Sequence, residues 1–137
     1  MEPNGAPNEG DESGVDPLVT AIRRASPFGP GDAAAAWRAV ERRLRTDSPF
    51  AARWTECLGY FLRSADPELA LATWVRWIED DLAADEDSGH DARTRAGAWD
   101  ASGLYREGFA RIAGASPALG NLLLRHWEHF APDSWGS

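Results

Sequence analysis

The amino-acid sequence predicts an all-α protein, a single compact bundle of about five to six helices. The first observation is a helix-start signal, a short polar residue followed by proline. The polar side chain can accept a hydrogen bond from a free N–H of the first turn, and proline has no N–H to leave unpaired. The second observation is that apolar residues recur with the helical period after each signal. The signals are Asp16-Pro17, Ser48-Pro49, Asp66-Pro67 and Ser116-Pro117.

These signals and patterns place the helices in order along the chain. The first two are separated by the turn 26–31, where two prolines and two glycines prevent a continuous helix. Asp32 should cap the second helix. The short connection 64–66 predicts that the third and fourth helices form an antiparallel hairpin. The predicted helices cover residues 17–25, 33–45, 49–63, 67–83, 100–113 and 117–130.

Each predicted helix has an apolar side that should face the core. Gly108 lies on such a side and should permit a close helix approach, and Gly114 is expected to end its helix in a left-handed conformation. The inward sets, in chain order, are Leu18, Ile22 and Ala25; Ala33, Trp37, Val40 and Leu44; Phe50, Trp54, Cys57, Leu58, Phe61 and Leu62; Leu71, Trp74, Val75, Ile78 and Leu82; Tyr105, Phe109 and Ile112; and Leu119, Leu122, Leu123 and Phe130.

Length and composition predict one folded domain between two tails. A chain of 137 residues is one domain by length. Residues 1–15 are rich in Gly, Asn, Pro, Glu and Asp and should be a disordered tail, because they carry too little apolar surface to offset the entropy of ordering. The helical domain is expected over 16–131 and a C-terminal tail over 132–137.

Several absences in the sequence indicate a cytoplasmic protein. The chain has no 18-residue apolar run and no charged-then-apolar signal pattern at its N-terminus. Its single cysteine, Cys57, excludes an intrachain disulfide and fits a reducing compartment. All 14 basic residues are arginine, which we interpret as the codon bias of a G+C-rich bacterial genome.

The net charge of −8 argues against two classes of partner. Nucleic-acid binding depends mainly on basic groups that neutralise phosphates, and anionic membrane surfaces also attract basic segments. We therefore expect no nucleic acid and no membrane as a partner. A basic protein surface is the complementary partner that this charge favours.

His126 and His129 form an H-x-x-H pair that could hold a transition metal. The alternative is one core or interface histidine and one histidine that compensates the helix dipole. Cys57 lies on a buried stripe, where a packing role is expected, since a catalytic thiolate needs an accessible electropositive setting. The sequence identifies no catalytic residue, and no cofactor is expected apart from such a metal.

Other residues are candidates for contact with a partner protein. Glu79, Asp80 and Asp81 belong to an acidic run for which a solvated helix end and loop is the first interpretation. They also add negative charge to a predicted helix C-terminus, which the helix dipole disfavours, and this penalty favours a partner contact as the alternative. Arg38 and Arg42 share one face of the helix over 33–45. Their alternatives are ion pairs within the chain or a basic recognition helix for DNA, which the acidic chain disfavours.

Two tryptophans are candidate interface anchors. Trp77 lies about 120° from the centre of its helix's apolar stripe, at about 100° per residue, and Trp135 lies in the C-terminal tail. The alternative for Trp77 is packing under a neighbouring helix. The abundant aromatic residues also leave open a bundle with an aromatic pocket for a small ligand.

Three aromatic motifs lie within about residues 49–113. They are Phe50-x-x-x-Trp54, Thr73-Trp74-x-x-Trp77 and Tyr105-Arg106-x-x-Phe109. In order and approximate spacing they resemble the helical domain shared by nitrile hydratase β-subunit N-termini and their small accessory (activator) proteins. This resemblance implies a non-catalytic partner that supports the assembly of a metal centre in a larger enzyme subunit.

Taken together, these observations favour a non-enzymatic accessory, adaptor or regulatory protein that binds another protein; self-association is compatible with them. A small enzyme or metal-binding protein that uses His126, His129 and nearby carboxylates is the first alternative. A ligand-binding bundle with an aromatic pocket is the second.

Overall fold

The computed structural model describes residues 16–27, 31–88 and 95–130, and every regular element in these ranges is helical. The all-α prediction is therefore confirmed for the described residues. None of these helices is both long enough and apolar enough to span a membrane. The helices are α2 (Pro17–Ala25), α3 (Ala33–Glu41), α4 (Pro49–Ala52), α5 (Trp54–Arg63), α6 (Pro67–Ser88), α7 (Arg95–Ala101), α8 (Gly103–Ala113), α9 (Pro117–Arg125) and a 3-10 helix, η1 (Trp127–Phe130).

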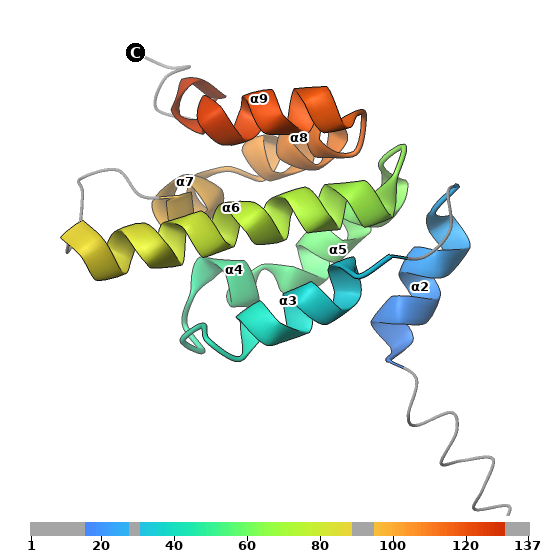
Figure 1. Ribbon diagram of the computed structural model, residues 1–137, viewed down its shortest axis with the longest axis horizontal. Helices are drawn as coiled ribbons and strands as arrows, with labels where there is room; N and C mark the ends of the chain where they lie inside the picture. Colours follow the sequence, from blue (N-terminus) through green and yellow to red (C-terminus); the bar gives the residue numbers. More distant parts are fainter. Residues whose placement is uncertain (1–15, 28–30, 89–94, 131–137) are drawn as a thin grey trace, which may run out of the picture.

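The long helix α6 is the centre of the arrangement (Figure 1). It packs against α2, α3, α5, α7, α8 and α9. Helices α8 and α9 form an antiparallel pair on one side of α6, while α3, α4 and α5 lie on the other (Figure 1). Because α6 has neighbours on several sides, it buries side chains around most of its circumference.

All four predicted start signals form their hydrogen bonds. In each, the polar side chain accepts a bond from a backbone N–H two or three residues later, at 2.9 to 3.3 Å. Asp32 differs, because its side chain makes no such bond. The N–H of Ala33 instead donates to Glu68 Oε2 at 2.9 Å, so α3 is capped by a residue of α6. The Ser26 hydroxyl in turn accepts the N–H of Glu68 at 3.2 Å.

The structure has eight α-helices in the described residues, more than the five to six predicted, because predicted helices are interrupted. The segment 49–63 breaks at Arg53, whose φ of −99° and ψ of 11° leave the helical region. Ser102 is extended and its hydroxyl caps α8, so α7 ends before it. The last helix ends at Arg125, because His126 adopts φ −123° and ψ 27°.

Two glycine predictions are wrong. A Cβ on Gly108 would meet no atom within 4 Å, so this glycine mediates no close approach. Gly114 has φ −88° and ψ −3°, an ordinary right-handed conformation. It is confined by contact instead, since a Cβ there would lie 2.6 Å from Ser64 Oγ.

These two glycines should respond in opposite directions to alanine. Gly108→Ala is expected to raise the free energy of unfolding by about 0.5–1 kcal/mol, because it removes backbone freedom in the unfolded chain without a clash. Gly114→Ala should lower it by about 1–3 kcal/mol, since its Cβ must displace Ser64. Urea unfolding of both variants measures the difference, and an equal response would contradict the packing described.

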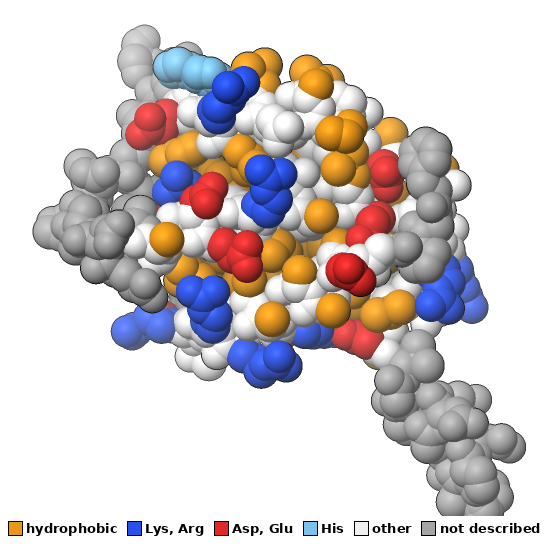
Figure 2. All heavy atoms as spheres, in the orientation of Figure 1, with side chains coloured by type: hydrophobic (Ala, Val, Ile, Leu, Met, Phe, Trp, Pro, Cys, Tyr) orange, Lys and Arg blue, Asp and Glu red, His pale blue; other side chains and the backbone are white. Residues whose placement is uncertain are grey.

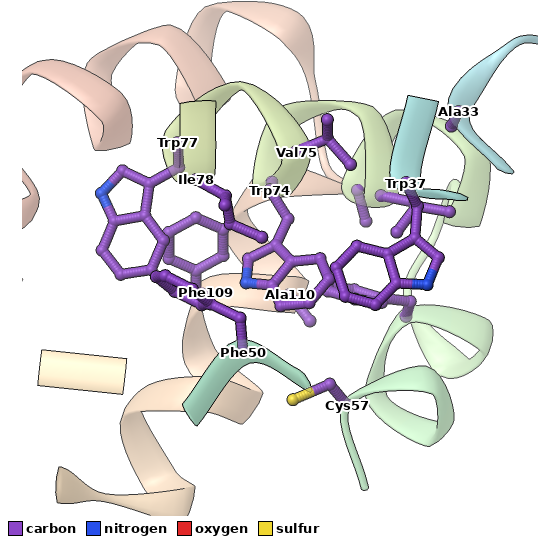
Figure 3. Close-up of a cluster of buried hydrophobic side chains, with 14 of the residues drawn as sticks. Ala33, Trp37, Phe50, Cys57, Trp74, Val75, Trp77, Ile78, Phe109 and Ala110 are labelled. Atoms are coloured by element: carbon purple, nitrogen blue, oxygen red, sulfur yellow. The ribbon is translucent and has the colours of Figure 1, made fainter. Parts of the chain in front are cut away.

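The core is a continuous cluster of aromatic rings. Trp74 and Trp77 extend from α6, Trp37 joins them from α3 and Phe50 reaches them from α4 (Figure 3). Six tryptophans form an unbroken series of ring contacts, with centroid distances between 4.6 and 5.8 Å. In order, the series is Trp54, Trp37, Trp74, Trp99, Trp77 and Trp127.

Four of these tryptophans have a buried indole N–H with no hydrogen-bond acceptor. Trp37, Trp74, Trp77 and Trp99 have no solvent exposure, and the indole nitrogen of each lacks a partner. Buried polar groups are usually hydrogen-bonded, because an unpaired one costs about 1–3 kcal/mol. The interior is therefore held by ring packing, which outweighs this penalty.

A buried arginine connects α5, α7 and α8. The Arg106 side chain is 6% exposed; its Nε donates to Glu56 Oε2 at 2.7 Å and its Nη1 to the Trp99 carbonyl at 2.6 Å. The Tyr60 hydroxyl also donates to Glu56, at 3.0 Å. These bonds hold α8 in register with α5, which determines the outer surface of α8.

Because of this network, the free energy of unfolding should vary with pH in the acidic range. The hydrogen bond from Arg106 lowers the pKa of Glu56 below its ordinary value of 4.5 against the opposing effect of burial, and the Tyr60 bond adds to the lowering. The stabilising contribution is therefore complete above about pH 4.5 and is lost as the pH falls through the folded-state pKa. Glu56→Gln should flatten the acid side of a plot of unfolding free energy against pH, measured with urea. An unchanged slope would contradict this role.

Candidate functional site

The prediction that Trp77 is a partly exposed anchor is wrong. Its side chain has no solvent exposure and contacts Phe109, with centroids 4.7 Å apart, and Trp127, at 5.8 Å. The off-stripe position is buried because α8 and η1 cover that side of α6. Trp135, the other predicted anchor, lies outside the described residues.

The two candidate arginines, Arg38 on α3 and Arg42 directly after it, have different surroundings. Arg38 forms two bonds to the Asp16 carboxylate, at 2.7 and 2.9 Å, and one to Glu41 at 3.0 Å. The hydrogen bond from Arg38 lowers the pKa of Asp16 despite the opposing effect of burial. Arg38 thus makes the ion pair within the chain that was the alternative to a partner contact. Arg42 is exposed.

The candidate acidic residues also differ in their surroundings. Glu79 and Asp80 are exposed in the C-terminal half of α6, but the helix continues to Ser88, so their predicted position at a helix C-terminus is wrong. Asp81 is turned toward α7, where its carboxylate accepts the backbone N–H of Arg95 at 3.2 Å and lies 3.8 Å from the Arg95 guanidinium. Of these three residues, only Glu79 and Asp80 therefore carry exposed carboxylates that make no ion pair within the described residues.

His126 and His129 are both exposed and stack on each other, with ring centroids 5.5 Å apart and an interplanar angle of 9°. The alternative of a core histidine is wrong, because the helix ends at Arg125 and both side chains are exposed. No group of three or more His, Cys, Asp or Glu residues arranged for a metal occurs in the described part of the chain, and the metal interpretation stays a prediction. Cys57 is buried, and burial raises the pKa of its thiol to about 12.

The exposed large apolar side chains of the described residues all lie on the α8–α9 hairpin. They are Leu104 on α8, 70% exposed, and Leu119 and Leu122 on α9, 45% and 42% exposed. We call these three leucines the hairpin surface. Figure 2 shows hydrophobic side chains along the edge formed by α9, with histidine at one end of that helix.

The inward prediction for Leu119 and Leu122 is wrong because α9 places a different side against α6. A Cβ on Gly120 would lie 3.2 Å from Thr73 Oγ1, so this glycine allows α9 to approach α6 closely. Leu123, on the same side, is 1% exposed. Gly120 is the signal in the sequence that could have identified the contact side; the leucines alone could not.

Arginines lie near the hairpin surface although the whole chain is acidic. Arg111 on α8 and Arg125 at the end of α9 are exposed. Arg111 pairs with Glu107 at 3.0 Å, one turn earlier on α8. This part of the molecule therefore combines apolar side chains with exposed arginines, unlike the part of α6 that carries Glu79 and Asp80.

Two hollows lie on the outer side of α8. The first has a volume of about 580 Å³ and is lined by Leu104, Glu107, Gly108 and Arg111. The second, of about 400 Å³, lies toward α5. Its lining residues are Tyr60, Arg63, Ser64, Ala65, Glu107 and Arg111. The first hollow is open and lined by α8 alone, whereas the second lies between α5 and α8. Glu107 and Arg111 belong to both, and we call this adjoining surface the α8 groove.

Comparison with known proteins identifies no relative. No family model matches the chain, and neither the curated proteins nor the solved structures include a match. The aromatic residues that carry the resemblance described above take part in the ring contacts of the core. The residues of that resemblance therefore pack the interior, and the surface candidates rest on the geometry of this chain alone.

Proposed function

We propose that this protein is a non-enzymatic accessory or adaptor protein that binds another protein through the hairpin surface. The observation that carries the proposal is the location of Leu104, Leu119 and Leu122 on one helical hairpin, exposed to solvent. Large apolar side chains that stay exposed are candidates for interaction sites, since their burial by a partner is favourable.

The interior supports the same interpretation. The tryptophans fill the space between the helices by contacting one another, as the short ring distances from Trp37 to Trp54 and Trp74 illustrate. This packing favours a structural use of the aromatic residues over an aromatic pocket. The exposed Glu79 and Asp80 supply a second contact, toward a basic part of the partner.

The identity of the partner is part of the proposal. The resemblance of the three aromatic motifs implies a larger enzyme subunit whose metal centre requires assistance during assembly. In that case the protein contributes no catalytic residue and acts while it is bound to the subunit.

Affinity purification from the organism that carries the gene tests the proposal. The wild-type protein is compared with Leu119→Asp/Leu122→Asp, and the control Ala35→Asp/Ala39→Asp adds the same charge to exposed positions of α3. We expect one protein to be retained by the wild type and the control and to fall about tenfold or more with the leucine variant, since buried charge opposes association. Equal recovery with all three, or no retained protein, would refute the proposal; circular dichroism verifies folding.

A further inference from the structure

We propose that the α8 groove binds an amphipathic helix of the partner protein that carries a large apolar residue and a carboxylate one turn apart. The inference rests on the proposed function and specifies the chemistry of the partner. Two different hollows, both lined by the Glu107–Arg111 ion pair, define this chemistry.

The first hollow is suited to an apolar side chain. Gly108 forms its floor, and since nothing lies within 4 Å of a Cβ position there, the space above the helix is open. Leu104, one turn earlier, is 70% exposed beside it. An apolar side chain placed over Gly108 would remove both its own surface and that of Leu104 from water, which is favourable in proportion to the apolar area buried.

The second hollow is suited to a carboxylate. Arg63 is exposed, and its guanidinium lies over the Tyr60 ring, 5.4 Å from the ring centroid. This contact orients the guanidinium, and none of the ion pairs of the described residues includes Arg63. A planar guanidinium can bind a carboxylate through two parallel hydrogen bonds. Glu107, which lines both hollows, pairs with Arg111 at 3.0 Å.

The secondary structure of the groove favours a helical occupant. The floor is the outer side of α8, whose backbone groups are bonded within the helix, so a partner gains no main-chain hydrogen bonds there. Recognition must then use side chains, as in the binding of an amphipathic helix in a groove. Residues four apart on such a helix lie about 5–6 Å from each other and can reach two adjoining hollows.

Binding of synthetic helical peptides to the full-length protein tests this inference. The probe is an alanine-based helix with one leucine and one glutamate four residues apart, and matched peptides replace glutamate with lysine or leucine with alanine. In ¹H–¹⁵N spectra, we expect the probe to shift the resonances of Gly108, Leu104 and Arg63, and each replacement to weaken binding about tenfold. Equal binding of all peptides, shifts elsewhere, or no shift at millimolar peptide would overturn the inference.

Protein variants provide the matching test. Gly108→Leu fills the first hollow and Arg63→Glu reverses the charge of the second, so each should reduce probe binding about tenfold. The controls Ala39→Leu and Arg24→Glu make the same changes at exposed positions elsewhere and should bind normally. Groove variants that bind like these controls would overturn the inference.

Two outcomes separate the inference from the proposed function and from self-association. If a cellular partner is lost with Leu119→Asp/Leu122→Asp but retained by Gly108→Leu, the groove inference fails while the proposed function stands. If sedimentation without peptide shows self-association that Gly108→Leu abolishes, the occupant is a second copy of this chain, which also overturns the inference. The exposed Glu79 and Asp80 of that copy would be the groups to examine.

Discussion

Trp74→Ala is expected to lower the free energy of unfolding by about 4 kcal/mol, within the range for deletion of a buried aromatic side chain. The indole contacts Trp37, Trp99 and Phe61, with centroid distances of 4.9, 5.3 and 5.1 Å, and has no solvent exposure. A domain of this size has a free energy of unfolding of about 5–15 kcal/mol. The variant should therefore retain only marginal stability. Thermal and urea unfolding measure the loss.

Two controls distinguish ring packing from a general effect of substitution in this experiment. Trp74→Phe keeps an aromatic ring and removes an indole N–H that has no acceptor, so it should cost much less than alanine. Leu104→Ala, at a 70% exposed position, should change stability by less than about 0.5 kcal/mol. A Trp74→Ala effect as small as that of Leu104→Ala would show that the aromatic series does not support the fold.

Glu56→Ala is expected to lower the free energy of unfolding by about 3 kcal/mol, because it leaves a buried cation without its carboxylate. Arg106 is 6% exposed and would keep only its bond to the Trp99 carbonyl. The effect falls at the lower end of the usual range because Glu56 itself is 32% exposed and water can enter its place. Urea unfolding at neutral pH measures the change.

The matched control removes a carboxylate from an exposed ion pair. Arg45 and Asp47 are 3.2 Å apart with side chains 85% and 75% exposed, so Asp47→Ala should cost less than about 1 kcal/mol. Similar losses for the two variants would contradict the assignment of Glu56 to a buried network.

The parts of the fold that depend on neighbouring residues could be predicted from the sequence. The four polar-proline signals place their caps correctly because donor and acceptor lie within three residues of each other. The cap of α3 could not be predicted, since Glu68 lies 35 residues from Ala33. The break at Arg53 likewise lies within a continuous apolar pattern that gives no local signal.

The candidate site depends on how helices are rotated against each other, which periodicity alone does not determine. Trp77 is off the stripe of α6 yet buried, because α8 and η1 cover that side. Leu119 and Leu122 match an inward pattern yet are exposed, because Gly120 and Leu123 contact the interior instead. The sequence therefore predicts which residues are apolar, whereas packing decides which of them remain available to a partner.

The bond from Ala33 to Glu68 also has a consequence for synthesis on the ribosome. The acceptor that completes the first turn of α3 is 35 residues downstream, so the nascent helix leaves the exit tunnel without it. A short helix lacking tertiary support is unstable in water. At about 5–20 residues per second of translation, several seconds pass before α6 emerges to provide the missing acceptor. The N-terminal half should therefore be open to chaperones or proteases during this interval, and folding should follow the arrival of α6.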